Sequence, residues 1–308
     1  MYVSYIDVDS NLQSILQYGT PQFPVRCFMD VFSRLLNNRL NWHWHTELEL
    51  VVILQGTVRY YLGEQCIILS TGDGVFINSG TMHSAEPDLE CDDAIMFAVA
   101  FSPEFIMAPH SLVYQNCVAP FIANSGFPGT GLYGKIPWQR RILDAIKSLS
   151  ILEANPTFSY ELQYHNNICL AWLEIITNLG ESLKGERKKS PPDVRRTKLM
   201  MEYIHSHYSE DISITDISES ANISKSECFR CFRKVLGKKP FEYLIEYRLE
   251  QAIKQISVSD RSISEIAADC GFNHHSYFGK QFKKFTGNTP NEYRKSVRLR
   301  HAGESALK

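Results

Sequence analysis

The chain has 308 residues, of which 44% are apolar, and this is enough for two hydrophobic cores. No apolar run approaches the roughly 18 residues of a membrane span, and the first residues lack the basic and apolar regions of a signal peptide, so we expect a cytoplasmic protein of two domains. The formal net charge of −2 is unevenly divided: residues 1–183 hold 8 basic and 18 acidic side chains, and residues 184–308 hold 24 and 16. A basic second half indicates a polyanionic partner, although a surface imbalance without function has the same composition.

The first distinctive segment spans residues 41–84 and has the pattern of β-strands. Apolar and polar residues alternate from Trp42 to Val52, and glycines separate the runs that follow. The pattern predicts consecutive antiparallel strands. The odd-numbered polar residues of this run, which would share one face of a continuous strand, are His43, His45, Glu47 and Glu49.

These residues resemble the double motif of the cupin barrel. The matches to H-x-H-x(3)-E and to G-x(5)-P-x-G-x(2)-H are His43, His45, Glu49, Gly72, Gly80 and His83, with Asn78 in the place of the proline. In metal-dependent cupins three histidines and a carboxylate converge on a divalent ion, which suits oxygenase or isomerase chemistry. The resemblance implies an antiparallel β-barrel, and it leaves open a metal held by His43, His45, Glu49 and His83.

Two helical stretches follow, at residues 138–155 and 158–183. The second has an apolar stripe at three- and four-residue steps, formed by Cys169, Trp172, Ile176, Leu179 and Leu183. This stripe has two interpretations: it covers the barrel, or it pairs with its copy in a second chain as a short antiparallel coiled coil. Residues 184–193 are charged, contain glycine and proline, and show no apolar period, so they read as a linker.

An internal repeat follows the linker. Residues 213–243 align with residues 262–293, with an offset of 49 before the turn and 50 after it. Each copy reads as a short helix, a tight turn and a second helix that ends at a glycine. This is the pattern of a helix-turn-helix unit.

The second helix of each copy is amphipathic. Its apolar face is formed by Cys228, Phe232 and Val235 in the first copy and by Phe278, Phe282 and Phe285 in the second. The opposite face carries hydroxyl and basic side chains, which suit the phosphates and base edges of a DNA major groove. The residues on that face are Ser226, Phe229, Arg230 and Arg233 in the first copy, and Ser276, Gly279, Lys280 and Lys283 in the second.

The stretch from Gly271 to Arg294 resembles the signature of the AraC/XylS transcription regulators. The matching runs are GF, SYF and KQFKKFTGNTPNEYR, and the repeat spacing agrees with them. The resemblance implies an all-helical domain over residues 194–300, whose two units insert their second helices into adjacent major grooves of double-stranded DNA. By position it adds Lys225, His274 and His275 to the residues expected to contact DNA. Residues 240–257 read as one connecting helix of about 27 Å, close to the roughly 34 Å between successive major-groove faces.

The same resemblance assigns roles to the first half of the chain. It implies a cupin-like effector domain over residues 1–137, with an N-terminal arm, and a dimer formed through residues 138–183. Such domains bind an effector, often a sugar, inside the barrel without chemistry. The residues expected to face that effector are His43, His45, Glu49, Arg59, Tyr61 and His83.

The sequence thus predicts an α+β multidomain protein: a sequence-specific transcription activator that is controlled by a small molecule, binds DNA as a homodimer and has no resident cofactor. The alternative is a metal-dependent cupin enzyme fused to a DNA-binding domain. Two further pairs could ligate a metal ion, Cys228 with Cys231 and His274 with His275. No second ligand pair stands at metal spacing, so we favour core packing for the cysteines. The histidines lie at a helix N-terminus with no acid or thiol nearby in the sequence, so we favour polar DNA contact or helix capping for them.

Overall fold

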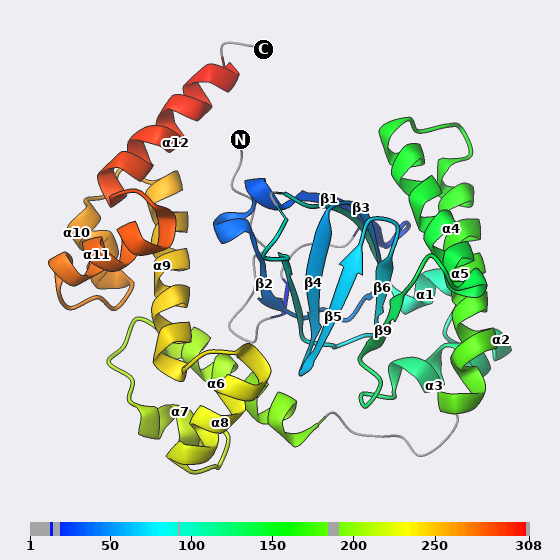
Figure 1. The fold of residues 1–308 in the computed structure, drawn as a ribbon, viewed down its shortest axis with the longest axis horizontal. Helices are drawn as coiled ribbons and strands as arrows, with labels where there is room; N and C mark the ends of the chain where they lie inside the picture. Colours follow the sequence, from blue (N-terminus) through cyan, green and yellow to red (C-terminus); the bar gives the residue numbers. More distant parts are fainter. Residues whose placement is uncertain (1–12, 15–18, 92, 184–190, 306–308) are drawn as a thin grey trace. The chain divides into compact units, whose positions relative to one another are not determined.

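A computed structural model of the protein describes residues 13–14, 19–91, 93–183 and 191–305. These residues divide into two compact units between Val194 and Arg195, which we call the N-terminal and C-terminal domains. The first contains the strands and the helices up to α5, and the second is helical (Figure 1). The predicted fold class, an antiparallel sheet domain followed by an all-helical domain, is confirmed.

The described strands of the N-terminal domain form two antiparallel sheets. The larger has the order β1-β8-β3-β6-β9, with the bounds Val25–Val31, Ile95–Phe101, Leu48–Gln55, Gly74–Ile77 and Gly129–Leu132. The smaller has the order β2-β7-β4-β5, with the bounds Leu40–His43, His83–Pro87, Thr57–Leu62 and Gln65–Ser70. Within the described residues no strand pairing joins the two sheets, so the barrel is open.

The core between the sheets follows the alternation of the strands. In β4, Val58, Tyr60 and Leu62 are at most 1% exposed, whereas Arg59 and Tyr61 point to the other face. The buried residues of β4 pack in one cluster with apolar residues of β3, β6 and β8 from the larger sheet. The two sheets therefore face each other across a shared interior.

Helices cover the outer face of the larger sheet (Figure 1). α4 packs on β3, β8 and β9, and α5 packs on α4. The helical bounds in this domain are η1 Phe32–Arg34, η2 Leu36–Asn38, α1 Pro103–Ile106, α2 Leu112–Cys117, α3 Ala119–Ile122, α4 Pro137–Ala154 and α5 Tyr160–Leu183. A second buried cluster joins these helices to the sheet, so the helices after the strands belong to the same compact unit.

The predicted apolar stripe of α5 faces this second cluster. Trp172 is 4% exposed, and Cys169, Ile176 and Leu179 pack against the cluster, while the side chain of Leu183 lies outside the described residues. The stripe packs within its own chain, as the first interpretation predicts, and a coiled coil with a second chain stays a prediction. The apolar residues that α5 exposes lie on another face and are Leu162, Leu170 and Leu173.

The C-terminal domain contains the two predicted helix-turn-helix units (Figure 1). They are formed by α7 with α8 and by α10 with α11, and α9 joins them. The bounds are α6 Pro192–His207, α7 Ile214–Ser220, α8 Lys225–Leu236, α9 Pro240–Val258, α10 Ile263–Asp269, α11 His275–Thr286 and α12 Pro290–Ser305. In the described part of the chain no helix combines the length and the apolar character needed to cross a bilayer.

Local sequence sets the ends of these helices. Ser213 and Ser262 begin α7 and α10 with capping boxes, in which the acid three residues on returns to the N-cap backbone. Gly237 and Gly287 end α8 and α11 with φ of 68° and 78°, a left-handed conformation that favours glycine. The repeat in the sequence therefore becomes a repeat in structure, in which a capped first helix precedes a recognition-type helix that ends at a left-handed glycine.

Candidate functional site

Three histidines and one glutamate converge in the interior of the N-terminal domain. The predicted continuous strand is broken: His43 ends β2, Glu49 lies in β3, and these strands belong to different sheets. His45 lies on the connection between them, and His83 begins β7, where it pairs with His43. The four side chains are between 0% and 5% exposed. Ring nitrogens of the three histidines lie within 4.8 Å of one another.

Hydrogen bonds fix the orientation of each ring. Nδ1 of His43 donates to the carbonyl of Asn41 at 2.8 Å, that of His45 to Glu47 at 3.2 Å, and that of His83 to Thr81 at 2.8 Å. Because a carbonyl only accepts, Nδ1 carries the proton in the neutral form of each ring, and Nε2 then presents a lone pair. This is how metal-binding histidines are held by their surroundings.

The Glu49 carboxylate lies among these lone pairs. Its Oε2 is 2.8 Å from Nε2 of His45 and 3.4 Å from Nε2 of His83, which makes no hydrogen bond to the described residues. Burial raises the pKa of Glu49, but its contacts with His45 and His83 outweigh burial and leave the pKa well below its usual range. Burial, together with the neighbouring His83 and His45, lowers the pKa of His43, so this ring is neutral at pH 7.

Such a constellation needs a cation. A carboxylate and imidazole lone pairs that face each other in a buried space repel unless a proton or a metal ion lies between them. The donor set of three histidines and a carboxylate is one that zinc, iron and other first-row divalent ions accept. His43, His45, Glu49 and His83 are thus able to hold such an ion, which would supply Lewis-acid or coordination chemistry there.

Two of the residues predicted to face the interior do not. Arg59 and Tyr61 lie on the opposite face of β4, where both contact Glu86: Arg59 Nη2 lies 3.2 Å from Oε1, and the Tyr61 hydroxyl donates to Oε1 at 2.8 Å. The reason is register. Leu62 pairs with His83, so the even-numbered residues of β4 share the face of His83 and the odd-numbered ones do not. Placing Arg59 and Tyr61 beside the histidines was therefore wrong.

The interior has two further polar groups that sequence analysis missed. Tyr60 stacks parallel to His83, with ring centroids 6.3 Å apart. Asp30, in β1, is partly buried, and burial together with the charge of Glu49 raises the pKa of its carboxyl to about 7. The sequence feature that could have indicated Asp30 is a single acidic residue within the largely apolar strand VRCFMDV.

Asn78 stands where the cupin motif has proline, and its amide holds several segments together. The side chain is 1% exposed, and its Nδ2 donates to the carbonyls of Phe121 at 3.0 Å and Phe127 at 2.9 Å. Its Oδ1 accepts from the backbone N–H of Ser79 at 2.9 Å. Asn78 therefore ties the segment before His83 to α3, a role that proline cannot perform.

Replacing Asn78 with alanine is expected to destabilise the N-terminal domain by about 2–4 kcal/mol, because two buried carbonyls lose a donor and a small cavity opens. All four tryptophans lie between residues 42 and 172, so urea unfolding followed by tryptophan fluorescence reports this domain alone. Asn166→Ala, on the exposed surface of α5, is the matched control and is expected to change stability by less than about 0.5 kcal/mol. Equal unfolding midpoints for the two variants would contradict this role of Asn78.

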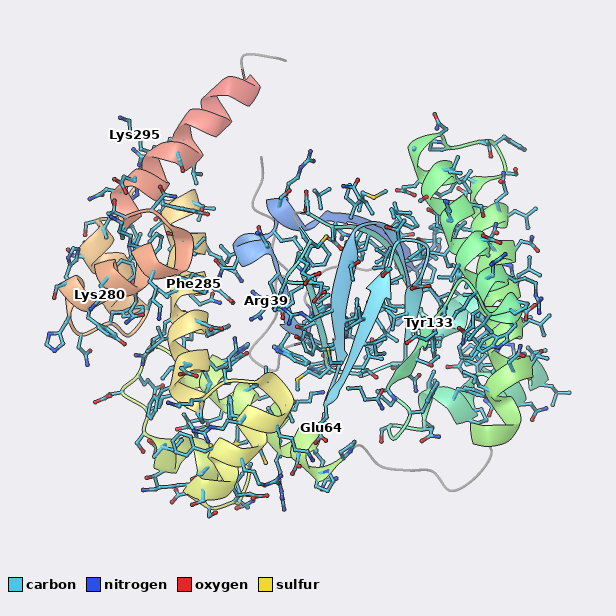
Figure 2. The ribbon with its side chains drawn as sticks, viewed as in Figure 1. Arg39, Glu64, Tyr133, Lys280, Phe285 and Lys295 are labelled. Atoms are coloured by element: carbon cyan, nitrogen blue, oxygen red, sulfur yellow. The ribbon has the colours of Figure 1, made fainter. Side chains whose placement is uncertain are left out.

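The predicted DNA-facing residues lie on one side of α8 and α11. The apolar faces are turned inward: Cys228, Phe232, Phe278 and Phe282 are fully buried, Val235 is 4% exposed, and Phe285 is partly buried. The exposed residues are Lys225, Ser226, Arg230 and Arg233 in the first unit, and His274, His275, Ser276, Lys280 and Lys283 in the second. Phe229 is partly buried. Figure 2 shows Lys280 on α11. Contact of these residues with DNA stays a prediction.

The cysteine pair of α8 belongs to the core. Cys228 and Cys231 are 0% exposed free thiols. Burial raises the pKa of Cys228 to about 12, so its thiol is protonated at pH 7. A protonated thiol does not attack a disulfide, and the complete burial of both cysteines agrees with core packing.

Comparison with known proteins gives matches over both domains. Residues 31–111 match the profile described as an AraC-like ligand binding domain, and residues 217–296 match the one described as a helix-turn-helix domain. The chain is 31% identical over 288 residues to the uncharacterized HTH-type transcriptional regulator YdeC of Bacillus subtilis (strain 168), a match that covers 94% of this chain and 97% of that one. It is 21% identical over 299 residues to LumQ of Photobacterium leiognathi, a probable transcriptional regulator, covering 92% and 100%.

Among solved structures, that of ToxT from Vibrio cholerae aligns with a TM-score of 0.42 and 13% identity over 87% of this chain and 97% of that one.

Proposed function

The chain belongs to the AraC/XylS family of transcription regulators, and from this premise we propose that α8 and α11 read adjacent major grooves under the control of a ligand held by the histidine cluster. The protein is a DNA-binding regulator with a ligand-binding domain. The operator, the ligand and the direction of regulation, which we take to be activation, belong to the proposal.

The proposal that the protein binds DNA rests on one observation: α8 and α11 expose the same kind of helix face. Two helices in equivalent positions bury their apolar sides and expose basic and hydroxyl side chains. The helix between them, α9, has 19 residues and a length of about 28 Å. This is close to the roughly 34 Å between successive major-groove faces, so one chain can serve two grooves of one duplex.

The ligand site we propose is the interior at His43, His45, Glu49 and His83, with Tyr60 and Asp30 facing the same space. A hydroxylated effector such as a sugar suits these donors and acceptors. A second candidate is a metal-dependent sensor, which the close approach of three buried histidines, two of them beside the Glu49 carboxylate, favours. The relatives compared are named as transcriptional regulators, so we propose regulation by the bound ligand and no catalytic residue.

We also propose that the protein acts as a homodimer. The exposed apolar residues Leu162, Leu170 and Leu173 recur along α5 at helical spacing and offer a face for a second copy. This replaces the buried stripe as the candidate contact. A ligand that shifts the N-terminal domains of such a dimer would alter how its DNA-binding domains reach two half-sites.

Purified protein separates the two ligand candidates. We expect protein stripped with a chelator to regain stability when zinc, nickel, manganese or iron(II) is added if the cluster holds a metal, with a rise that grows with metal concentration. His83→Ala should abolish that rise, and His110→Ala, outside the cluster, should preserve it. A rise with sugars and none with metals would favour the effector. Light scattering measures the mass of the particle and so tests the homodimer. Selection of bound duplexes from a random pool, with and without the stabilising ligand, tests whether the ligand controls sequence-specific DNA binding.

A further inference from the structure

One carboxylate on the surface of α8 holds two arginines. Glu227 accepts from Nε of Arg230 at 2.8 Å through Oε2 and from Nη2 of Arg230 at 2.6 Å through Oε1. Oε1 also accepts from Nη1 of Arg196, on α6, at 3.0 Å. The contact with Arg230 is a two-point fork, which fixes the plane of the guanidinium as well as its position.

The local sequence gives this carboxylate a different default role. Ser224 and Glu227 have the S-x-x-E spacing of a capping box, and Ser213 with Asp216 and Ser262 with Glu265 form such boxes at α7 and α10. At α8 the Ser224 side chain caps the helix, but Glu227 does not complete the box. Its carboxylate is directed to the two arginines instead.

The second unit lacks this arrangement. An offset of 50 places Tyr277 at the position of Glu227 and Lys280 at the position of Arg230. Lysine is a single point of charge without a planar fork. The two recognition-type helices therefore present different chemistry at equivalent positions.

We infer that Glu227 is a positioning residue for base recognition, which holds Arg230 in the plane needed for a bidentate contact with one guanine of the operator. A guanidinium that pairs with a carboxylate along one edge has another edge of amino nitrogens, and guanine offers O6 and N7 as a matching pair of acceptors in the major groove. At these two equivalent positions, Arg230 of α8 discriminates a base and Lys280 of α11 contacts a phosphate. The inference rests on the proposed DNA-binding function.

The direction in which DNA affinity changes when Glu227 is removed separates a positioning role from a purely electrostatic one. Glu227 is a negative charge on a helix face that we propose meets DNA. If it only repelled phosphates, its removal would strengthen binding to every duplex. If it positions Arg230, its removal weakens binding to the operator and leaves binding to unrelated DNA unchanged or stronger.

The experiment compares full-length wild type with Glu227→Ala, Glu227→Gln, Arg230→Ala and the control Glu219→Ala, which removes an equal charge from the exposed surface of α7. The probes are an operator obtained by selection from a random pool and a scrambled duplex at the same salt. We expect E227A to bind the operator about 10-fold more weakly, as loss of one oriented bidentate contact implies, and E227Q to lie between E227A and wild type. E219A should bind both duplexes as tightly as wild type or slightly tighter.

Operators with 7-deazaguanine at single positions locate the contact, because this base lacks N7. One such substitution should weaken wild type about 10-fold and E227A less than about 3-fold. Circular dichroism checks that each variant keeps its helices. If E227A behaves like E219A while R230A has lost operator affinity, the positioning role is overturned and the DNA face stands. If R230A retains full operator affinity, the proposed face itself is wrong.

Discussion

Replacing Asp30 with asparagine is expected to stabilise the N-terminal domain at pH 8 by about 1–3 kcal/mol. Burial and the charge of Glu49 raise the pKa of this carboxyl to about 7. A carboxyl pKa that rises from about 4 to about 7 on folding lowers stability by at most about 4 kcal/mol once the pH exceeds 7. We reduce that figure because the side chain is partly exposed. Asparagine keeps the shape and removes the charge.

The pH dependence of D30N provides the sharper test, because two groups act in opposite directions. Asp30 binds a proton more readily in the folded state, so in wild type its contribution to stability increases as the pH falls from 7 toward 4. His43 has a folded pKa well below 6.5, so its contribution decreases as the pH falls below 6.5. The two slopes oppose each other in wild type. In D30N the His43 slope, of about 1.4 kcal/mol per pH unit below pH 6.5, is no longer opposed by Asp30.

Urea unfolding between pH 5 and pH 8, followed by tryptophan fluorescence in the presence of a chelator, measures this difference. Asp144→Asn, on the exposed side of α4, removes an equal charge and serves as the control. We expect its pH profile to parallel that of wild type. A D30N profile that also runs parallel to wild type would show that Asp30 titrates normally in the folded protein.

The C-terminal domain was the more predictable half because its pattern is local. A helix turns through a fixed angle per residue, so the spacing of Phe278 and Phe282 alone determines which residues share a face. The duplicated pattern then provided an internal check, since Cys228 and Phe232 are buried at equivalent positions. The exposed faces of α8 and α11 act on a second molecule, DNA. Neither the sequence pattern nor the fold of this chain contains that molecule, so the contacts of these faces could not be predicted residue by residue.

The N-terminal site was only half predictable because strand faces depend on register. The cupin-like spacing identified His43, His45, Glu49 and His83, and these four residues do converge. Whether Arg59 or Tyr60 joins them depends on how β4 pairs with β7, and that pairing is set by tertiary contacts. The burial of the α5 stripe likewise depended on which surface was nearby: an apolar helix face fits a sheet of its own chain as well as a second chain.

Arg230→Ala and Lys280→Ala are expected to weaken operator binding in two distinguishable ways. Arg230 is placed for a base contact, so its loss should lower operator affinity by about 5- to 150-fold and change binding to a scrambled duplex little. Lys280 is placed for a phosphate, so its loss should weaken both duplexes and reduce the slope of log affinity against log salt by about 1. Because the two residues lie on separate recognition-type helices, the double variant should lose roughly the product of the two factors.

Titrations of both duplexes at several salt concentrations measure these effects, and Lys147→Ala on α4 is the control for loss of one positive charge outside the proposed DNA face. If only α8 engaged DNA, K280A would match K147A while R230A alone lost affinity, and the proposal of two adjacent grooves would fail. If the double variant bound the operator like wild type, neither exposed face would be the one that meets DNA. If the double variant loses the product of the two single factors, and only K280A reduces the slope of log affinity against log salt, both helices contact the same duplex.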